Sequence, residues 1–222
     1  NLHLSGLSLC RGANYPKSEF SEPCYVNSVS GACFAIPKDL FFLLGGFDEV
    51  FFLYVEDTDI SLRCLAYGKV IKYVPNSVIY HNYVLKFGPL KTYYQERNRL
   101  YMMKKNFKPK TLKVLWPIML TTEVITIGFC LLRGKNDIRN YINAHQWIKE
   151  NETLIEKGSK ESQGIQRVSD FDILRLLGWK IEFSQTSSKP FSFLLSFCFS
   201  PFLFIFKEIV LFRLKKLSLA TD

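Results

Sequence analysis

The stretch that decides the fold is GGFDEVFFLYVEDTDISLR, at residues 45–63. Two glycines open it, an aromatic run follows, and the acidic pair Glu56-Asp57 leads into apolar residues spaced as on one helix face. Acidic side chains are favoured in the first turn of a helix, and a glycine commonly ends one, here Gly68. The stretch therefore predicts a helix over residues 58–67 with a cluster of acids at its start.

The segments around this helix predict further short elements. Small and β-branched residues predict a strand over 25–36, and Pro37 suits the first turn of a short helix that reaches residue 44. Two more short strands are predicted at 70–74 and 77–81, hinged at the Pro-Asn pair between them. The first part of the chain is therefore predicted to contain short strands and helices separated by turns.

The second half of the chain is predicted to be mainly helical. Pro89 begins a helix, and its end divides the chain into an α/β half, 1–106, and a helical region, 107–222. A polar helix is predicted over 137–157. The pattern Ser-Asp-Phe-Asp that starts at Ser169 is typical of a helix N-terminus.

Two apolar segments of the helical region indicate contact with a membrane. Residues 114–132 include one charged side chain, Glu123, and also Pro117, and a spanning helix needs about 20 apolar residues, so this segment is borderline. Segment 190–212 begins with seventeen uncharged residues, seven of them Phe, and basic residues follow it. We rank a helix in or dipping into the membrane surface first, a spanning helix second and a buried core helix third.

Composition excludes several classes of protein. The chain has 222 residues, 48% of them hydrophobic and 22% charged, which excludes a disordered or collagen-like chain. Its six cysteines include no C-x-x-C pair, which argues against a zinc site, and its length argues against a small disulfide-stapled scaffold. We therefore expect reduced thiols and a cytosolic setting.

The charge is unevenly distributed. The chain has 29 Lys and Arg against 20 Asp and Glu, for a formal net charge of +9. Residues 86–113, which we call the basic block, contain nine basic side chains and one acid, Glu96. So dense a block indicates an anionic partner, either phosphate groups, an anionic membrane surface or nucleic acid. No nucleic-acid-binding motif accompanies it, so we expect no nucleic acid partner.

Several motifs follow one another in a recognisable order along residues 11–106. A small-residue strand end at 30–32 precedes the GGFDE loop, the aromatic run, the Glu-Asp pair, a strand that ends at His81, and the triplet Arg-Asn-Arg at 97–99. This order and spacing resemble the acceptor-side half of family-two glycosyltransferases of the GT-A type, in particular the rhamnosyltransferase-like branch. The resemblance implies an α/β fold: a partial GT-A domain, with a mixed sheet and helices, followed by a helical, membrane-associating tail.

The resemblance also implies a reaction, the inverting transfer of a sugar from a nucleotide-sugar donor to a polysaccharide or glycolipid acceptor. Such a transfer needs a base that takes the proton of the acceptor hydroxyl, and the family gives this role to Asp57, held at a helix N-terminus. Glu56 would orient the acceptor or the loop, Gly31 would let backbone approach a sugar, and Asp48 would bond to sugar hydroxyls. Asp59 would cap the helix. Without the resemblance, Glu56, Asp57 and Asp59 would only start a helix. Gly31 and Asp48 would only shape turns.

A divalent metal, Mg²⁺ or Mn²⁺, is implied at the donor diphosphate, with His81 in the place of a frequent ligand. A lone histidine beside tyrosines is otherwise more often a hydrogen-bonded core residue. Arg97 and Arg99 do not share a helix face. We expect one to meet the diphosphate and the other to pair with a carboxylate such as Glu56 or Asp48. The alternative for both arginines is a basic helix face against a membrane.

The D-x-D spacing at residues 57–59 belongs to the acceptor motif because it lies at the acidic helix start. The nucleotide-binding D-x-D of the family lies in an upstream βαβ half that this sequence does not show. We therefore expect a C-terminal portion, inactive alone, of an enzyme on the cytoplasmic side of the cell membrane. The rival hypothesis is a non-catalytic, membrane-peripheral interaction protein that binds anionic lipid through its basic block.

Overall fold

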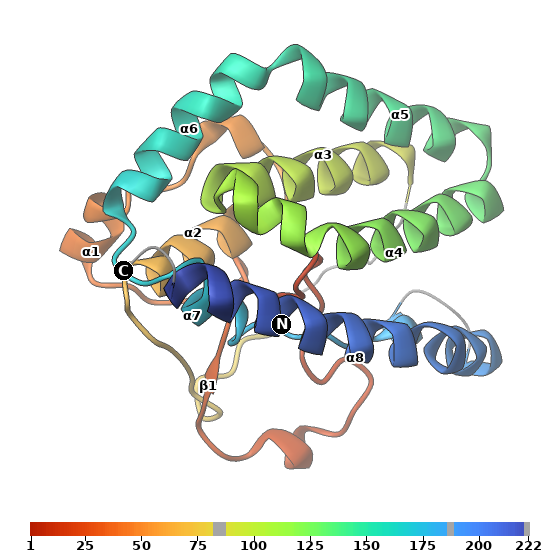
Figure 1. The fold of residues 1–222 in the computed structure, drawn as a ribbon. Coiled ribbons are helices and arrows are strands. Elements are labelled where there is room, and N and C mark those ends of the chain that lie inside the picture. Colours follow the sequence, from red (N-terminus) through yellow and green to blue (C-terminus); the bar gives the residue numbers. More distant parts are fainter. Residues whose placement is uncertain (82–87, 186–188, 220–222) are drawn as a thin grey trace.

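The computed structural model describes residues 1–81, 88–185 and 189–219 and shows a mixed α/β fold that is mostly helical (Figure 1). In chain order its elements are η1 (Lys17–Phe20), β1 (Cys24–Val26), α1 (Lys38–Leu43), η2 (Glu49–Phe51), α2 (Glu56–Ala66), β2 (Ile71–Tyr73), α3 (Pro89–Asn106), α4 (Pro109–Arg133), α5 (Lys135–Glu150), α6 (Glu152–Ile165), α7 (Asp170–Leu174), η3 (Phe183–Gln185) and α8 (Lys189–Leu219). Within the described residues the sheet consists of β1 and β2, which pair antiparallel, in place of the mixed sheet that the resemblance implies.

The predicted strand over 25–36 is wrong beyond the end of β1. The backbone N–H of Val29 donates to Oγ of Ser61 at 3.0 Å, and that of Gly31 donates to Oδ2 of Asp57 at 2.7 Å. Each backbone N–H donates to one main acceptor, so these two are not available to a neighbouring strand. The segment after β1 is therefore fastened to helix α2 by side chains.

The two strands predicted after α2 differ in outcome. The strand at 70–74 is confirmed as β2, one residue shorter at each end. The strand at 77–81 is wrong, because the chain turns after β2, with the N–H of Ser77 donating to the carbonyl of Val74, and no ladder partner occurs for it in the described part of the chain.

Local signals correctly mark several helix ends. Helix α2 stops before Gly68, whose φ of 81° lets its N–H bond back to the carbonyl of Leu65. Pro89 begins α3 and Pro109 begins α4. Ser169 caps α7, and its hydroxyl accepts the N–H of Asp172.

The helix predicted over 137–157 is wrong as one element. It is two helices, α5 and α6, which meet at Asn151 with φ −115° and ψ 30°. The side chain of Asn151 donates to the carbonyl of Trp147 at 2.9 Å, which satisfies an acceptor at the end of α5.

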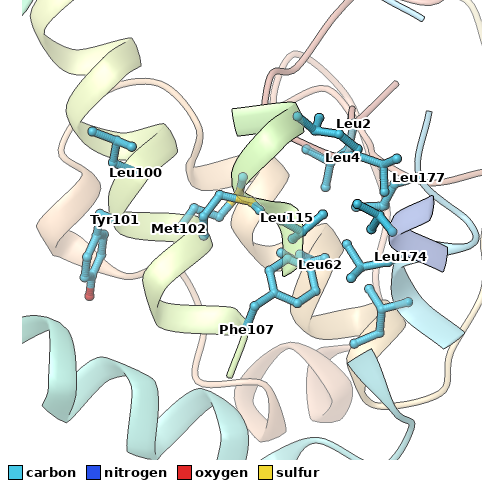
Figure 2. Packing of buried hydrophobic residues seen from close by; sticks show 14 of the residues in the cluster. Leu2, Leu4, Leu62, Leu100, Tyr101, Met102, Phe107, Leu115, Leu174 and Leu177 are labelled. Atoms are coloured by element: carbon cyan, nitrogen blue, oxygen red, sulfur yellow. The ribbon is translucent and has the colours of Figure 1, made fainter. Parts of the chain in front are cut away.

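The hydrophobic core gathers side chains that are far apart in the sequence. Figure 2 shows Leu2, Leu62, Met102, Leu115 and Leu174 converging from the N-terminal segment and from α2, α3, α4 and α7, and each of these residues is fully buried. Residues from both sides of the proposed boundary at 106 share this core. The division of the chain there stays a prediction.

Helices α4 and α8 pack against each other and run in opposite directions (Figure 1). Both are long and apolar enough to cross a membrane, by length and composition, over Pro109–Arg133 and Ser192–Lys216. We call their large apolar side chains that are more than half exposed the α4/α8 apolar surface: Trp116, Leu120, Val124, Leu131, Leu132, Phe193, Leu194, Phe197, Phe202, Ile205 and Phe212. Apolar surface of this extent is typical of a site that meets a membrane or another protein.

Candidate active site

Asp57 presents a fixed carboxylate at the start of α2. Its Oδ2 accepts the backbone N–H of Gly31 at 2.7 Å, and its Oδ1 accepts the backbone N–H of Thr58 at 2.7 Å. Gly31 is exposed and Asp57 is half-buried, so solvent reaches this corner. Oδ1 of Asp57 also accepts the hydroxyl of Thr58 at 3.1 Å. A carboxylate has about four acceptor positions, so these three bonds leave Asp57 capacity for one more. This is the arrangement that a general base requires.

Glu56 lies beside Asp57 and differs from it in environment. A Cβ added to Gly31 would lie 3.5 Å from Oδ2 of Asp57 and 3.6 Å from Oε1 of Glu56, so both carboxylates flank one backbone position. Oε2 of Glu56 is buried and has no hydrogen-bond partner among the described residues. Burial raises the pKa of Glu56, and the charge of Asp57 raises it further.

The loop that leads into this pair is strained. Phe52, Tyr54 and Val55 have φ values of 57°, 66° and 74°, a region that costs residues other than glycine on the order of 1–3 kcal/mol each. Phe52 is 78% exposed, and its ring lies 5.6 Å from that of Tyr94, centroid to centroid. Such strain persists only where the surrounding structure holds the chain.

Asn98 on α3 holds this loop by hydrogen bonds to its backbone. Its Nδ2 donates to the carbonyls of Phe51, Leu53 and Tyr54 at 2.9, 2.8 and 2.7 Å. The residue is fully buried. Sequence reasoning gave no role to Asn98, although an amide between two arginines on a helix was a visible signal.

Arg97 supports the same loop. Its Nη2 donates to the carbonyls of Val50 and Phe51 at 2.6 and 2.8 Å. Its guanidinium lies 5.0 Å from the ring centroid of Tyr94 and 4.8 Å from that of Trp147, and the residue is 7% exposed. The known partners of Arg97 are therefore protein groups, and a contact with a donor diphosphate stays a prediction.

Arg99 is buried among carboxylates. Its guanidinium pairs with Glu96 at 2.7 Å and with Glu123. The expectation that one arginine pairs with a carboxylate is met, but the expected partners, Glu56 and Asp48, are wrong. Helix α3 brings Arg99 toward α4 instead, where Glu123 lies. A diphosphate contact of Arg99 also stays a prediction.

Asp48 anchors the GGFDE loop. Its Oδ1 accepts the N–H of Val50 at 3.0 Å, and its Oδ2 accepts from the hydroxyl of Tyr101 at 2.8 Å and from Nζ of Lys105 at 2.7 Å. Burial opposes ionisation of Asp48, but the hydrogen bond and charge of Lys105 outweigh it and lower the pKa. These contacts tie Asp48 to α3, and its contact with a sugar stays a prediction.

Comparison with known proteins decides the family. The model of the glycosyl transferase family group 2 matches residues 17–221. The chain belongs to this family. It is 29% identical over 104 residues to the dTDP-rhamnosyl transferase RfbF of Shigella flexneri, which is 40% of this chain and 35% of that protein. It is 37% identical over 57 residues to an N-acetylglucosaminyl-diphospho-decaprenol L-rhamnosyltransferase of Mycobacterium tuberculosis (strain CDC 1551 / Oshkosh), which is 26% of this chain and 19% of that protein.

These matches confirm a glycosyltransferase of family two with a rhamnosyltransferase-like sequence. The matched part of the chain spans about a third of the length of the first relative and about a fifth of the second. No solved structure matches the chain.

The basic block of this glycosyltransferase is divided between interior and surface. The buried members are Lys91, Arg97, Arg99 and Lys105, the exposed members are Lys104, Lys108, Lys110 and Lys113, and Lys86 lies outside the described residues. Lys105 bonds to Asp59 as well as to Asp48. Asp59 is fully buried and also pairs with Arg63, so the expectation that it caps α2 is wrong. Among the described members of the block, the exposed lysines are therefore the ones that can meet an anionic surface.

The predicted metal ligand, His81, is not a member of the cluster of potential ligands that the structure shows. His81 is exposed in the segment after β2. Among the described residues, Glu96, Glu123 and His145 have potential ligand atoms that all lie within 4.8 Å of one another. Metal ligation by His81 stays a prediction.

The cluster around Arg99 fits an ion-pair network better than a metal. Nε2 of His145 lies 3.2 Å from Glu96 and 3.3 Å from Glu123, and these carboxylates raise the pKa of His145 to about 9 against the effect of burial. At neutral pH the two carboxylates therefore face two cations, Arg99 and the imidazolium. A divalent ion would have to displace a proton and lie beside a guanidinium, which is electrostatically unfavourable.

Proposed function

We propose that this chain forms the acceptor side of an inverting glycosyltransferase in which Asp57 is the general base. The observation that carries the proposal is the carboxylate of Asp57, fixed by the amides of Gly31 and Thr58 and half open to solvent. Oε1 of Glu56 approaches the same position of Gly31 as the carboxylate of Asp57, and Glu56 would orient the acceptor through a hydrogen bond.

In the proposed reaction an acceptor hydroxyl attacks the anomeric carbon of the donor sugar. Asp57 takes the hydroxyl proton while the new carbon–oxygen bond forms. The bond from the anomeric carbon to the nucleoside diphosphate breaks, and the diphosphate leaves with the electron pair. Attack from the face opposite the leaving group inverts the configuration at the anomeric carbon.

We take rhamnose as the first sugar to test, since the names of both relatives specify rhamnosyl transfer. A glycan or a lipid-linked glycan is the proposed acceptor class. A divalent cation on the donor diphosphate belongs to the proposal as well, with His81 as its candidate ligand, and none of the steps above depends on it.

We also propose that the protein associates with the cytoplasmic face of the cell membrane. The α4/α8 apolar surface supports this proposal. Since the two helices run in opposite directions, the start of α4 and the end of α8 lie toward the same side of the molecule (Figure 1). Exposed basic residues occur at these ends: Lys108, Lys110, Lys113, Arg213, Lys215 and Lys216. Basic side chains beside apolar surface favour anionic lipid.

The proposed reaction is tested by the stereochemistry of transfer. The full-length protein would be incubated with a nucleotide-linked rhamnose and a lipid-linked glycan acceptor, and the product would be examined by NMR. We expect release of one nucleoside diphosphate for each sugar transferred and inversion at the anomeric carbon. A product with retained configuration would contradict the role given to Asp57.

A further inference from the structure

We propose that Asn98 is a positioning residue, which holds the strained loop so that Glu56 and Asp57 face the acceptor. The effect of Asn98 on catalysis rests on the proposed function. Its contact with the loop rests on the hydrogen bonds between α3 and the loop alone.

The orientation of the Asn98 amide follows from its neighbours. Three carbonyl oxygens, of Phe51, Leu53 and Tyr54, surround one end of the amide, and Nε of Arg97 lies 2.7 Å from the other end. Carbonyl oxygens only accept and Nε of arginine only donates. The amide nitrogen must therefore face the loop. Its two hydrogens donate to three carbonyl oxygens, so one hydrogen is shared between two of them.

The held carbonyls lie where the loop departs from ordinary backbone geometry. Leu53 lies between two residues with positive φ, Phe52 and Tyr54, and the positive φ of Val55 follows directly. The carbonyl of Val55 accepts the N–H of Asp59, which is the first hydrogen bond of α2. The last residue that Asn98 contacts is thus two positions before Glu56, with no flexible linker between the contact and the helix start.

Arg97 fixes Asn98 in turn. Its Nε donates to the amide oxygen, and its Nη2 donates to the carbonyls of Val50 and Phe51. Its guanidinium also lies within 5.0 Å of the ring centroids of Tyr94 and Trp147. The amide is therefore fastened at both ends. This arrangement explains how residues 52–55 keep an unfavourable conformation next to the catalytic pair.

Removal of the Asn98 amide should release the loop while leaving the donor-contacting part of the enzyme unchanged. We therefore expect Asn98→Ala in the full-length protein to lower kcat by about 10- to 100-fold, since small misplacement of a catalytic group costs this much. The KM for the donor should stay within about twofold of wild type. Amide hydrogens of residues 50–58 should exchange faster than in wild type.

Asn27 offers a matched control. It is also a buried asparagine that ties distant segments together: its side chain bonds to the N–H and the carbonyl of Leu2 and to the carbonyl of Leu176. Asn27→Ala should lower the melting temperature comparably but leave exchange at 50–58 as in wild type. Arg97→Lys is the milder second variant should Asn98→Ala fail to fold. It keeps the positive charge but loses the guanidinium, whose several N–H groups bond to Asn98 and to the loop at once.

The proposal is overturned if exchange at residues 50–58 is no faster in Asn98→Ala, or in Arg97→Lys, than in Asn27→Ala. It is also overturned if the variants at 98 and 27 lose kcat equally. A wild-type protein that transfers no sugar would contradict the proposed function instead, and the exchange comparison then decides the structural part of the proposal by itself.

Discussion

Glu123 on α4 accepts a hydrogen bond from the guanidinium of Arg99 on α3. Glu123 is the one charged residue of segment 114–132, and a charge in such a segment argues against a membrane helix. Its side chain is 17% exposed and also accepts from the hydroxyl of Tyr141. The acid therefore faces the protein, which leaves the outer side of α4 apolar.

Replacement of Arg99 should strongly destabilise the fold. Arg99→Met would leave Glu96, which is 4% exposed, without its closest cation. Loss of one partner of a buried ion pair costs about 3–5 kcal/mol of unfolding free energy, which urea denaturation measures. The control is Arg175→Met, because the pair of Arg175 with Asp172 is largely exposed and should cost about 0.5 kcal/mol or less. Equal losses in both variants would contradict the buried network.

The network should make stability depend on pH through His145. In the folded protein the pKa of His145 is raised from 6.5 to about 9, so the protonated form is favoured by folding. The stabilisation is fully present below about pH 6.5 and is lost as the pH rises through about 9. We expect the melting temperature to fall between pH 7 and 9.5, and to fall less in His145→Gln. Parallel curves for the two proteins would show that His145 takes no part.

Local signals in the sequence sufficed to predict the elements whose ends depend on one or two residues. Proline at the start of α3 and of α4, glycine after α2 and serine before α7 act through their own backbone geometry or side chain. These signals need no knowledge of the fold, so the corresponding ends are placed correctly.

The failures involve partners far apart in the sequence. The backbone N–H groups of Val29 and Gly31 donate to side chains of α2, so the strand predicted there does not form. Likewise, nothing near Asn98 in the sequence indicates that it would meet the carbonyls of Phe51, Leu53 and Tyr54, about forty-five positions earlier. Asp57 and Glu56 were placed together correctly because they are adjacent in sequence, whereas Arg99 met the carboxylates of α3 and α4 that packing brought to it.

The role of His81 is tested by metal dependence. His81→Ala in the full-length protein should raise the concentration of Mn²⁺ or Mg²⁺ needed for half-maximal transfer, because one ligand is lost. His145→Ala is the matched control and should leave that concentration unchanged, since its cluster is balanced by Arg99. An unchanged metal requirement in His81→Ala would make this histidine structural.

Membrane association is tested on exposed rings of α8. The double variant Phe193→Ser/Phe197→Ser removes side chains that are 75% and 74% exposed, so the fold should be retained. Burial of each ring in lipid contributes about 1.5–3 kcal/mol, so binding to anionic vesicles should weaken by at least about tenfold. Phe42→Ser, at a ring on α1 that is 65% exposed, should bind as wild type. Undiminished binding of the double variant would show that α8 is not the anchor.

The most direct test is the turnover number of Asp57→Asn in the full-length protein. Asparagine keeps an acceptor oxygen for the N–H of Gly31 or of Thr58, so the melting temperature should remain near that of wild type. The amide cannot take the acceptor proton, and we expect kcat to fall by about 100-fold or more. A folded Asp57→Asn protein with wild-type kcat would contradict the assignment of Asp57 as the general base.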